Sequence, residues 1–234
     1  MAASKTDPAS QMLSRRRATS GTGYRKGDVA KQRILDAALR AFAQDGFTVA
    51  STRQIAESAQ VTLPALQYYF GGKAGLYTAC AEAVAHRFAE LTAQPSAAAA
   101  AALSSGAGVA ELQAILKQTM ASVAAAMTAS DDARLWGAFA ARELMNPGPA
   151  FEVMLERLWA PGIELVAAMI ARIQGRAVAD EPARIRALLM IASITAFQSG
   201  RTVAMRALSW DSFGEAELAA VVHEISGEID RLIP

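Results

Sequence analysis

Cysteine and histidine are scarce in this chain of 234 residues, which holds one of the first and two of the second. The single cysteine, Cys80, excludes an internal disulfide and favours a reducing compartment. It has no obvious base partner, so we expect a buried thiol. His86 and His223 lie far apart, and neither has a metal-ligand spacing, so we expect no metal. A glycine-rich phosphate loop and a G-x-S-x-G motif are also missing. We therefore expect no cofactor and no enzymatic activity.

Long hydrophobic runs are missing too. The longest uncharged stretches are residues 91–110, which are rich in Ala, Ser, Gly and Pro, and residues 187–200, which are too short to span a bilayer. Met1 to Gln11 lacks the apolar centre of a signal peptide. We expect a soluble, cytoplasmic protein without a membrane partner.

Strand-like alternation of Val, Ile and Thr is nearly absent, although 53% of the residues are hydrophobic. This composition predicts an all-α fold. Charge is unevenly spread, with a net +6 over residues 1–80 and a net −5 over residues 81–234. A basic end beside an acidic body predicts that only the first part binds a polyanion. The patterns divide the chain into a disordered basic tail, 1–27, a small N-terminal domain, 28–73, and a larger helical domain, 74–234.

The stretch from Thr52 to Lys73 predicts two short helices joined by a tight turn. Thr52 is a candidate N-cap for the first of them, and Thr62 for the second. Pro64 falls in the first turn of the second helix, where its missing N–H costs little. We expect Gln60 near a left-handed conformation, at a cost of about 1 kcal/mol. This spacing is that of a helix-turn-helix, whose second helix enters the major groove of DNA.

Residues 32–76 resemble the N-terminal domain of TetR-type transcriptional repressors. The matching pieces are RILDAALRAFAQDGF, STRQIAESAQVT and QYYF-GGKAGL. Gln60 and Pro64 stand where Gly is frequent, and Gln67 where Tyr is usual, so the base preference does not follow from the resemblance. Residues 131–151, DDARLWGAFAARELMNPGPAF, also resemble the branch of this family typified by CecR. The resemblance implies a homodimer that binds a palindromic operator and is released by a small-molecule effector.

The candidate DNA contacts divide into those to bases and those to phosphates. Gln67 is suited to bidentate pairing with adenine, and Leu63 to contact with a thymine methyl group. Lys73, at a helix start, is placed to hold a phosphate. The full set is Thr52, Arg53, Thr62, Leu63, Gln67, Tyr68, Tyr69 and Lys73.

The rest of the chain predicts a helical bundle. We expect a first helix over residues 28–44, ended by Gly46, and a connecting helix over 74–92, followed by a flexible loop over 93–108. Further helices are expected over 110–129, 131–145, 150–174 with a kink at Pro161-Gly162, 182–208 and 214–232. The last two carry apolar faces that suit a four-helix dimer interface: Leu188, Leu189, Ile191 and Ile194, then Leu218, Val221, Val222, Ile225 and Ile229.

The resemblance implies an effector cavity in this bundle. Bulky side chains and polar groups within apolar helices are its candidate lining: Trp136, Phe139, Arg142, Glu143, Trp159, Phe197, Gln198 and Arg201. Any of the aromatic residues can instead be simple core. Arg142 needs an anion or a partner such as a glutamate, and the same holds for Arg201.

Three alternatives remain open at this stage. The protein can be an activator, a DNA-binding protein that does not respond to ligand, or a small-molecule-binding bundle with a vestigial DNA-binding head. The basic tail either lies along phosphates or in the minor groove, or has no fixed role.

Overall fold

The computed structural model describes residues 8–128 and 130–233. Its described residues form helices and no strand, which confirms the predicted all-α class. The elements are α1 (Pro8–Val49), α2 (Thr52–Ser58), α3 (Leu63–Phe70), α4 (Lys73–Ser105), α5 (Val109–Thr128), α6 (Asp131–Met145), α7 (Phe151–Met154), the π-helical turn η1 (Leu155–Trp159), α8 (Ala160–Ile173), α9 (Glu181–Ser199), α10 (Arg201–Ala207) and α11 (Glu215–Asp230).

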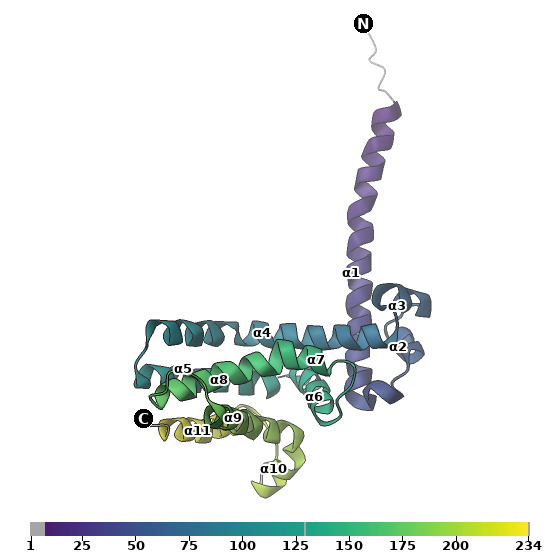
Figure 1. The fold of residues 1–234 in the computed structure, drawn as a ribbon. Coiled ribbons are helices and arrows are strands. Elements are labelled where there is room, and N and C mark those ends of the chain that lie inside the picture. The colour runs from purple at the N-terminus through teal and green to yellow at the C-terminus, as the bar shows by residue number, and fades with distance from the viewer. Residues whose placement is uncertain (1–7, 129, 234) are drawn as a thin grey trace.

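Helices α1 to α3 form a small head at one end of an elongated body (Figure 1). Helix α4 begins in the head, beside α1 and α3, and runs along the body, where α5 packs against it. Helices α5 to α11 make up the rest of the body. Helix α4 therefore packs on both the head and the body.

Helix α1 is longer than predicted. The expected stop at Gly46 is real, since this residue has φ +77° and interrupts the helical geometry, but one more turn follows to Val49. At the other end the helix begins at Pro8, where we expected a disordered tail. Extending an existing helix adds one hydrogen bond per residue, whereas nucleation is costly, so the packed part of α1 supports the segment before it. Residues 1–7 of the predicted tail lie outside the described residues.

The predicted loop over residues 93–108 is wrong. Helix α4 continues through Pro95 to Ser105, and Gly106 ends it with φ +73°. Alanine, the strongest helix former, dominates this stretch. Ala99 and Ala102 are buried in the hydrophobic core, so packing offsets the hydrogen bond that proline cannot donate.

Two other predicted helices are divided. The helix expected over residues 150–174 contains the π-helical turn η1, and Pro161 stands in the first turn of α8 behind it. The helix expected over residues 182–208 ends at Ser199, and α10 follows separately. Gly200 lies at this break, where an added Cβ would come within 2.7 Å of the carbonyl oxygen of Ala196.

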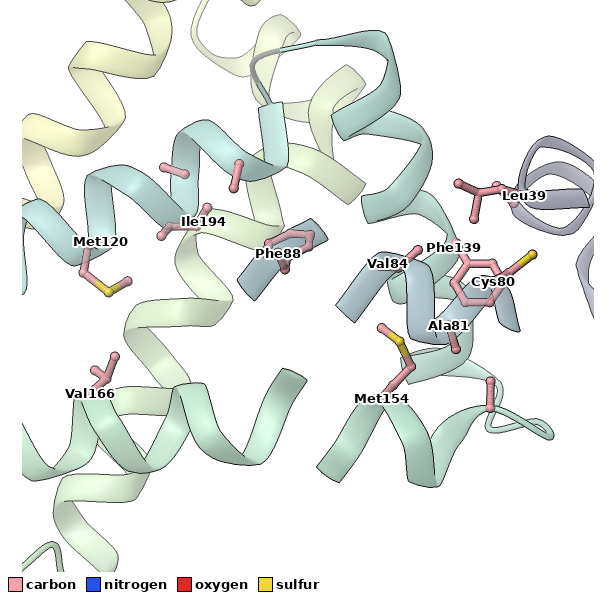
Figure 2. Close-up of a cluster of buried hydrophobic side chains, with 14 of the residues drawn as sticks. Leu39, Cys80, Ala81, Val84, Phe88, Met120, Phe139, Met154, Val166 and Ile194 are labelled. Carbon is pink, nitrogen blue, oxygen red and sulfur yellow. The ribbon is translucent and has the colours of Figure 1, made fainter. Parts of the chain in front are cut away.

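One continuous hydrophobic core joins the head to the body. In Figure 2, Leu39 of α1 lies near Phe139 of α6 and Cys80 of α4, and the core continues past Phe88 to the helices of the body. The sequence predicted Cys80 to be a buried thiol, and it is 1% exposed. Burial, with a smaller contribution from the charge of Asp36, raises the pKa of the Cys80 thiol to about 12. At neutral pH the thiol is therefore protonated and poorly nucleophilic.

Candidate nucleic-acid interface and effector cavity

The turn between α2 and α3 has the geometry that the sequence predicted. Gln60 has φ +54°, in the left-handed region, and the N–H of Val61 donates to the carbonyl of Ala56 at 2.9 Å. Arg33 of α1 donates from Nη2 to the carbonyl oxygens of Ala59 and, at 2.9 Å, of Gln60. Sequence reasoning missed this role of Arg33, because the turn lies 26 residues farther along the chain. The arginine fixes the turn and hence the orientation of α3.

The helix caps follow the prediction at one position and differ at another. Thr62 caps α3, and its Oγ1 accepts a hydrogen bond from the N–H of Ala65 at 3.3 Å. Ser51, and not Thr52, occupies the N-cap position of α2, although its side chain makes no capping hydrogen bond, and Thr52 is the first helical residue. Both residue types are good caps, so the sequence pattern had no means to choose between them.

Helix α3 buries one side and exposes the other. Leu66 is fully buried in the head, whereas Tyr68 is 84% exposed. Thr62, Leu63 and Gln67 are exposed as well, so the residues predicted to meet DNA lie on the outer side of this helix. The exception is Tyr69, which is half-buried and packs against Tyr68 with ring centroids 5.3 Å apart.

The flanking candidates include one exposed cation and one that is already engaged. Arg53 of α2 is exposed, and Thr52 beside it is half-buried. Lys73, at the start of α4, donates from Nζ to the carbonyl of Thr48 at 3.0 Å and lies 5.2 Å from the ring centroid of Phe47. An ammonium group has three donors, so this bond leaves two for a phosphate.

A cavity of about 460 Å³ lies where α6, α9 and α10 meet the end of α1. Four of the eight predicted effector residues line it, namely Arg142, Phe197, Gln198 and Arg201. The other lining residues are Ala43, Arg134, Ala138, Ala141, Met145, Asn146 and Ser199. Helices α6 and α9 approach closely here, since a Cβ on Gly137 would lie within 1.3 Å of Nε2 of Gln198.

The two arginines both bind backbone carbonyl groups. Arg142 donates from Nε to Ala43 at 3.2 Å and from Nη2 to Gln44 at 2.7 Å. It therefore connects α6 of the body to the last helical turn of α1 before Gly46. Arg201 donates from Nη2 to Phe213 at 3.0 Å and lies over the ring of that residue.

Glu143, predicted as an effector contact, is instead held inside the core, where it is 1% exposed. Its Oε2 accepts a hydrogen bond from the hydroxyl of Tyr77 at 2.6 Å, and its Oε1 accepts from the N–H groups of Gly148 at 2.7 Å and Ala150 at 3.2 Å. Burial, reinforced by Glu143, raises the pKa of Tyr77. These bonds connect α4 and α6 to the loop that follows α6.

The three remaining effector candidates lie apart from this cavity. Phe139 is fully buried, with its ring 5.0 Å from that of Tyr77. Trp136 lines a second cavity of about 300 Å³ between α4, α5 and α6, beneath the guanidinium of Arg87. Trp159 is half-buried, and its ring lies 5.6 Å from that of Phe151.

The apolar faces predicted for dimerisation are only partly exposed. Ile194 of α9 and Val221, Ile225 and Ile229 of α11 are buried in the core of the single chain. The outer face of α9 nevertheless keeps Leu188 at 49% and Leu189 at 66% exposed. Apolar residues recur every 3.6 positions both on a helix face that packs on the core and on one that packs on a partner. The sequence therefore could not distinguish the two kinds of face.

Within the described part of the chain, no group of three His, Cys, Asp or Glu residues is placed to hold a metal. No described helix has the length and apolar character needed to cross a membrane.

Two protein families match successive parts of the chain. The family described as bacterial regulatory proteins, tetR family, matches residues 34–80, which include the helix-turn-helix. The C-terminal domain of the HTH-type transcriptional dual regulator CecR matches residues 112–229, which is half of the chain and includes most of the cavity wall.

Individual relatives agree with these matches. The HTH-type transcriptional dual regulator CecR of Shigella flexneri is 27% identical over 219 residues, which covers 89% of this chain and 93% of that protein. A TetR-like transcriptional regulator from Rhodococcus sp. RHA1 has a TM-score of 0.62 at 19% identity, covering 86% of this chain and 94% of that one. A transcriptional regulator from Rhodococcus sp. Rha1 has a TM-score of 0.57 at 19% identity, covering 85% and 94%. At such low identity the two structures show the fold alone.

Proposed function

Because the chain belongs to the TetR family of bacterial regulatory proteins, with a C-terminal domain of the CecR type, we propose that it is a ligand-responsive transcriptional repressor. The family is one of DNA-binding regulators and not of enzymes. The proposed repressor works in the cytoplasm, binds a palindromic operator as a homodimer and releases it when a small molecule binds. The observation that carries this proposal is the outer side of α3, where Thr62, Leu63, Gln67 and Tyr68 are exposed.

Gln67, Leu63 and Thr62 are the proposed base contacts. The glutamine amide matches the edge of adenine, and the leucine suits a thymine methyl group. The proposed phosphate contacts come from the surrounding positions, where hydroxyl groups, cations and free N–H groups set the register without reading sequence. They are Thr52, Arg53, Tyr68, Tyr69 and Lys73.

The proposed dimer uses α9 and α11 of each protomer, packed as four helices. Leu188 and Leu189 are large apolar side chains that the single chain leaves exposed on α9, and Ile185 lies one turn before them at 49% exposure. A twofold axis through this interface presents two α3 helices to one side of the DNA. Successive major grooves lie about 34–36 Å apart, which fixes the spacing of the two half-sites.

The proposed effector site is the 460 Å³ cavity, because its wall includes Ala43 of the head as well as residues of the body. Occupation of the cavity changes the contact between α6 and α1 and shifts α4, which carries the movement to α3. A displacement of a few ångströms mismatches the two grooves and lowers operator affinity.

The test begins with selection of bound duplexes from a random DNA library, which is expected to yield an inverted repeat. Gel-shift titration then compares Gln67→Ala with Gln94→Ala, an exposed glutamine on the body. Gln67→Ala is expected to cost about 1–3 kcal/mol on the operator and to relax the preference at one base position. Gln94→Ala is expected to bind normally. Equal losses on operator and random DNA would remove the assigned role of Gln67.

Activation is a second candidate, favoured by the name of the Shigella flexneri relative, a dual regulator. In vitro transcription from the selected operator separates the two, because a repressor lowers the transcript level and an activator raises it.

A further inference from the structure

The wall of the 460 Å³ cavity is lined by positively charged side chains. Three arginines line it, Arg134, Arg142 and Arg201, and none of its described lining residues has a carboxylate. The remaining wall is mainly alanine, with one methionine and one phenylalanine. Cationic groups on apolar walls favour a ligand that is anionic at one end and apolar at the other.

Several arginines elsewhere on the described surface are paired with acids. Arg157 lies 3.3 Å from Glu82, and Arg184 lies 2.6 Å from Glu164. Arg142 and Arg201 differ from them, because among the described residues their hydrogen-bond acceptors are the carbonyl oxygens of Ala43, Gln44 and Phe213.

A carbonyl oxygen leaves the charge of a guanidinium uncompensated. The group also carries five N–H donors, of which the bonds described here occupy two in Arg142. A half-buried guanidinium that is held in place and still short of an anion is a preorganised receptor for one.

We propose that this cavity binds an organic anion with an apolar body, and that the acidic group of the ligand binds Arg142 and Arg201. The proposal rests on the proposed function, because it assigns the chemical class of the effector. The volume of about 460 Å³ suits a molecule of one or two fused rings or a medium-length chain.

The position of Arg142 gives this recognition a consequence for the head. Its side chain donates to Ala43 and Gln44, at the end of the regular part of α1. An acid carries a full negative charge where a carbonyl oxygen carries only a partial one, so the acid attracts the guanidinium more strongly than the helix end does. The ligand therefore draws Arg142 away from α1 and leaves the helix end without a partner from the body. A ligand that favours the released state in this way lowers operator affinity.

The experiment compares two fluorescent probes that share one apolar body. These are 1-anilinonaphthalene-8-sulfonate, which is an anion, and N-phenyl-1-naphthylamine, which is neutral. Fluorescence titration of the full chain is expected to give a dissociation constant for the anion at least about tenfold lower, as one added charge-assisted contact predicts. Arg142→Gln and Arg201→Gln are each expected to abolish this preference. Arg157→Gln, which removes an exposed and paired arginine of the body, is expected to keep it.

The same titrations contain the results that overturn the proposal. Equal affinities for the two probes in the wild type would exclude recognition of charge, and a preference that survives in both Arg142→Gln and Arg201→Gln would place the anion elsewhere. Circular dichroism verifies that each variant is folded, and Arg201→Gln tests the site without touching α1. Operator binding without any probe separates this proposal from the proposed function. If the protein binds its operator but shows no preference for the anion, the proposed repressor function stands and the anionic effector is refuted. If it binds no operator, the proposed function itself is refuted.

Discussion

Removal of one hydroxyl group from Tyr77 tests the connection between α4 and α6. The Tyr77 hydroxyl is the donor to Oε2 of Glu143 at 2.6 Å, while the two backbone N–H groups both reach Oε1. Tyr77→Phe therefore leaves Oε2 without a donor among the described residues. The ring itself is retained, together with its contacts to the rings of Phe42 at 4.8 Å and Phe139 at 5.0 Å between centroids. The substitution is therefore expected to lower stability through the lost hydrogen bond and not through a change in side-chain packing.

The expected size follows from the charge and burial of the acceptor. A hydrogen bond to a charged group contributes about 1.5–3 kcal/mol, and burial of the acceptor keeps water from replacing the donor. For a chain of this length each kcal/mol lowers the melting temperature by about 2–4 °C, so Tyr77→Phe is expected to lower it by about 3–12 °C. Thermal unfolding followed by circular dichroism measures the change.

Tyr68→Phe is the matched control, because its hydroxyl lies on a side chain that is 84% exposed. It is expected to leave the melting temperature unchanged. A double-mutant cycle with Glu143→Gln is expected to give a coupling of at least about 1 kcal/mol. The reasoning is refuted if Tyr77→Phe melts within about 1 °C of the wild type, because a buried carboxylate that loses its donor must lower the stability by more than that.

Three further predictions concern DNA, assembly and pH. Lys73→Ala is expected to weaken binding to all DNA sequences and to flatten the salt dependence by about one unit, with Lys117→Ala of the body as the gel-shift control. Leu189→Glu places an unpaired carboxylate at the proposed interface, so it is expected to give a folded monomer in sedimentation and weak operator binding in gel-shift experiments. Val178→Glu, in a loop, is the control and should stay dimeric. A dimeric, operator-binding Leu189→Glu would move the interface elsewhere. The raised pKa of Cys80, about 12 against an ordinary 9.0, predicts a contribution to stability that is complete below pH 9 and is lost as the pH rises towards 12. Unfolding free energies measured across this range should fall less steeply in Cys80→Ala, and equal slopes would contradict the assignment.

Local residue chemistry made the helix-turn-helix predictable. Thr62 accepts a bond from a neighbour three positions away, Pro64 suits a first helical turn, and Gln60 occupies the left-handed corner. Each of these preferences is satisfied within a few residues, so no distant part of the chain is needed to decide it. The all-α class and the burial of Cys80 were predictable for a similar reason, since periodicity and residue type report the average environment.

The course of α4 shows where local rules failed. Pro95 and the glycines after it predicted a break, yet the helix continues to Ser105 because α5 packs against its alanine face. The predicted dimerisation faces show the same limit. Leu189 of α9 and Ile225 of α11 both fit the helical period of their apolar faces, but only Ile225 is buried in the single chain. Which apolar face meets which neighbour is a property of packing, and periodicity alone does not contain it.

By itself the sequence determined the helical class, the helix-turn-helix and the presence of arginines that need partners in an apolar body. The tertiary structure decided what those partners are. Arg142 binds the carbonyls of Ala43 and Gln44, 99 and 98 residues away, and Glu143 beside it binds Tyr77, 66 residues away. A hydrogen bond depends on distance and direction in space, and only the folded chain brings groups so far apart in sequence within 3.2 Å of one another.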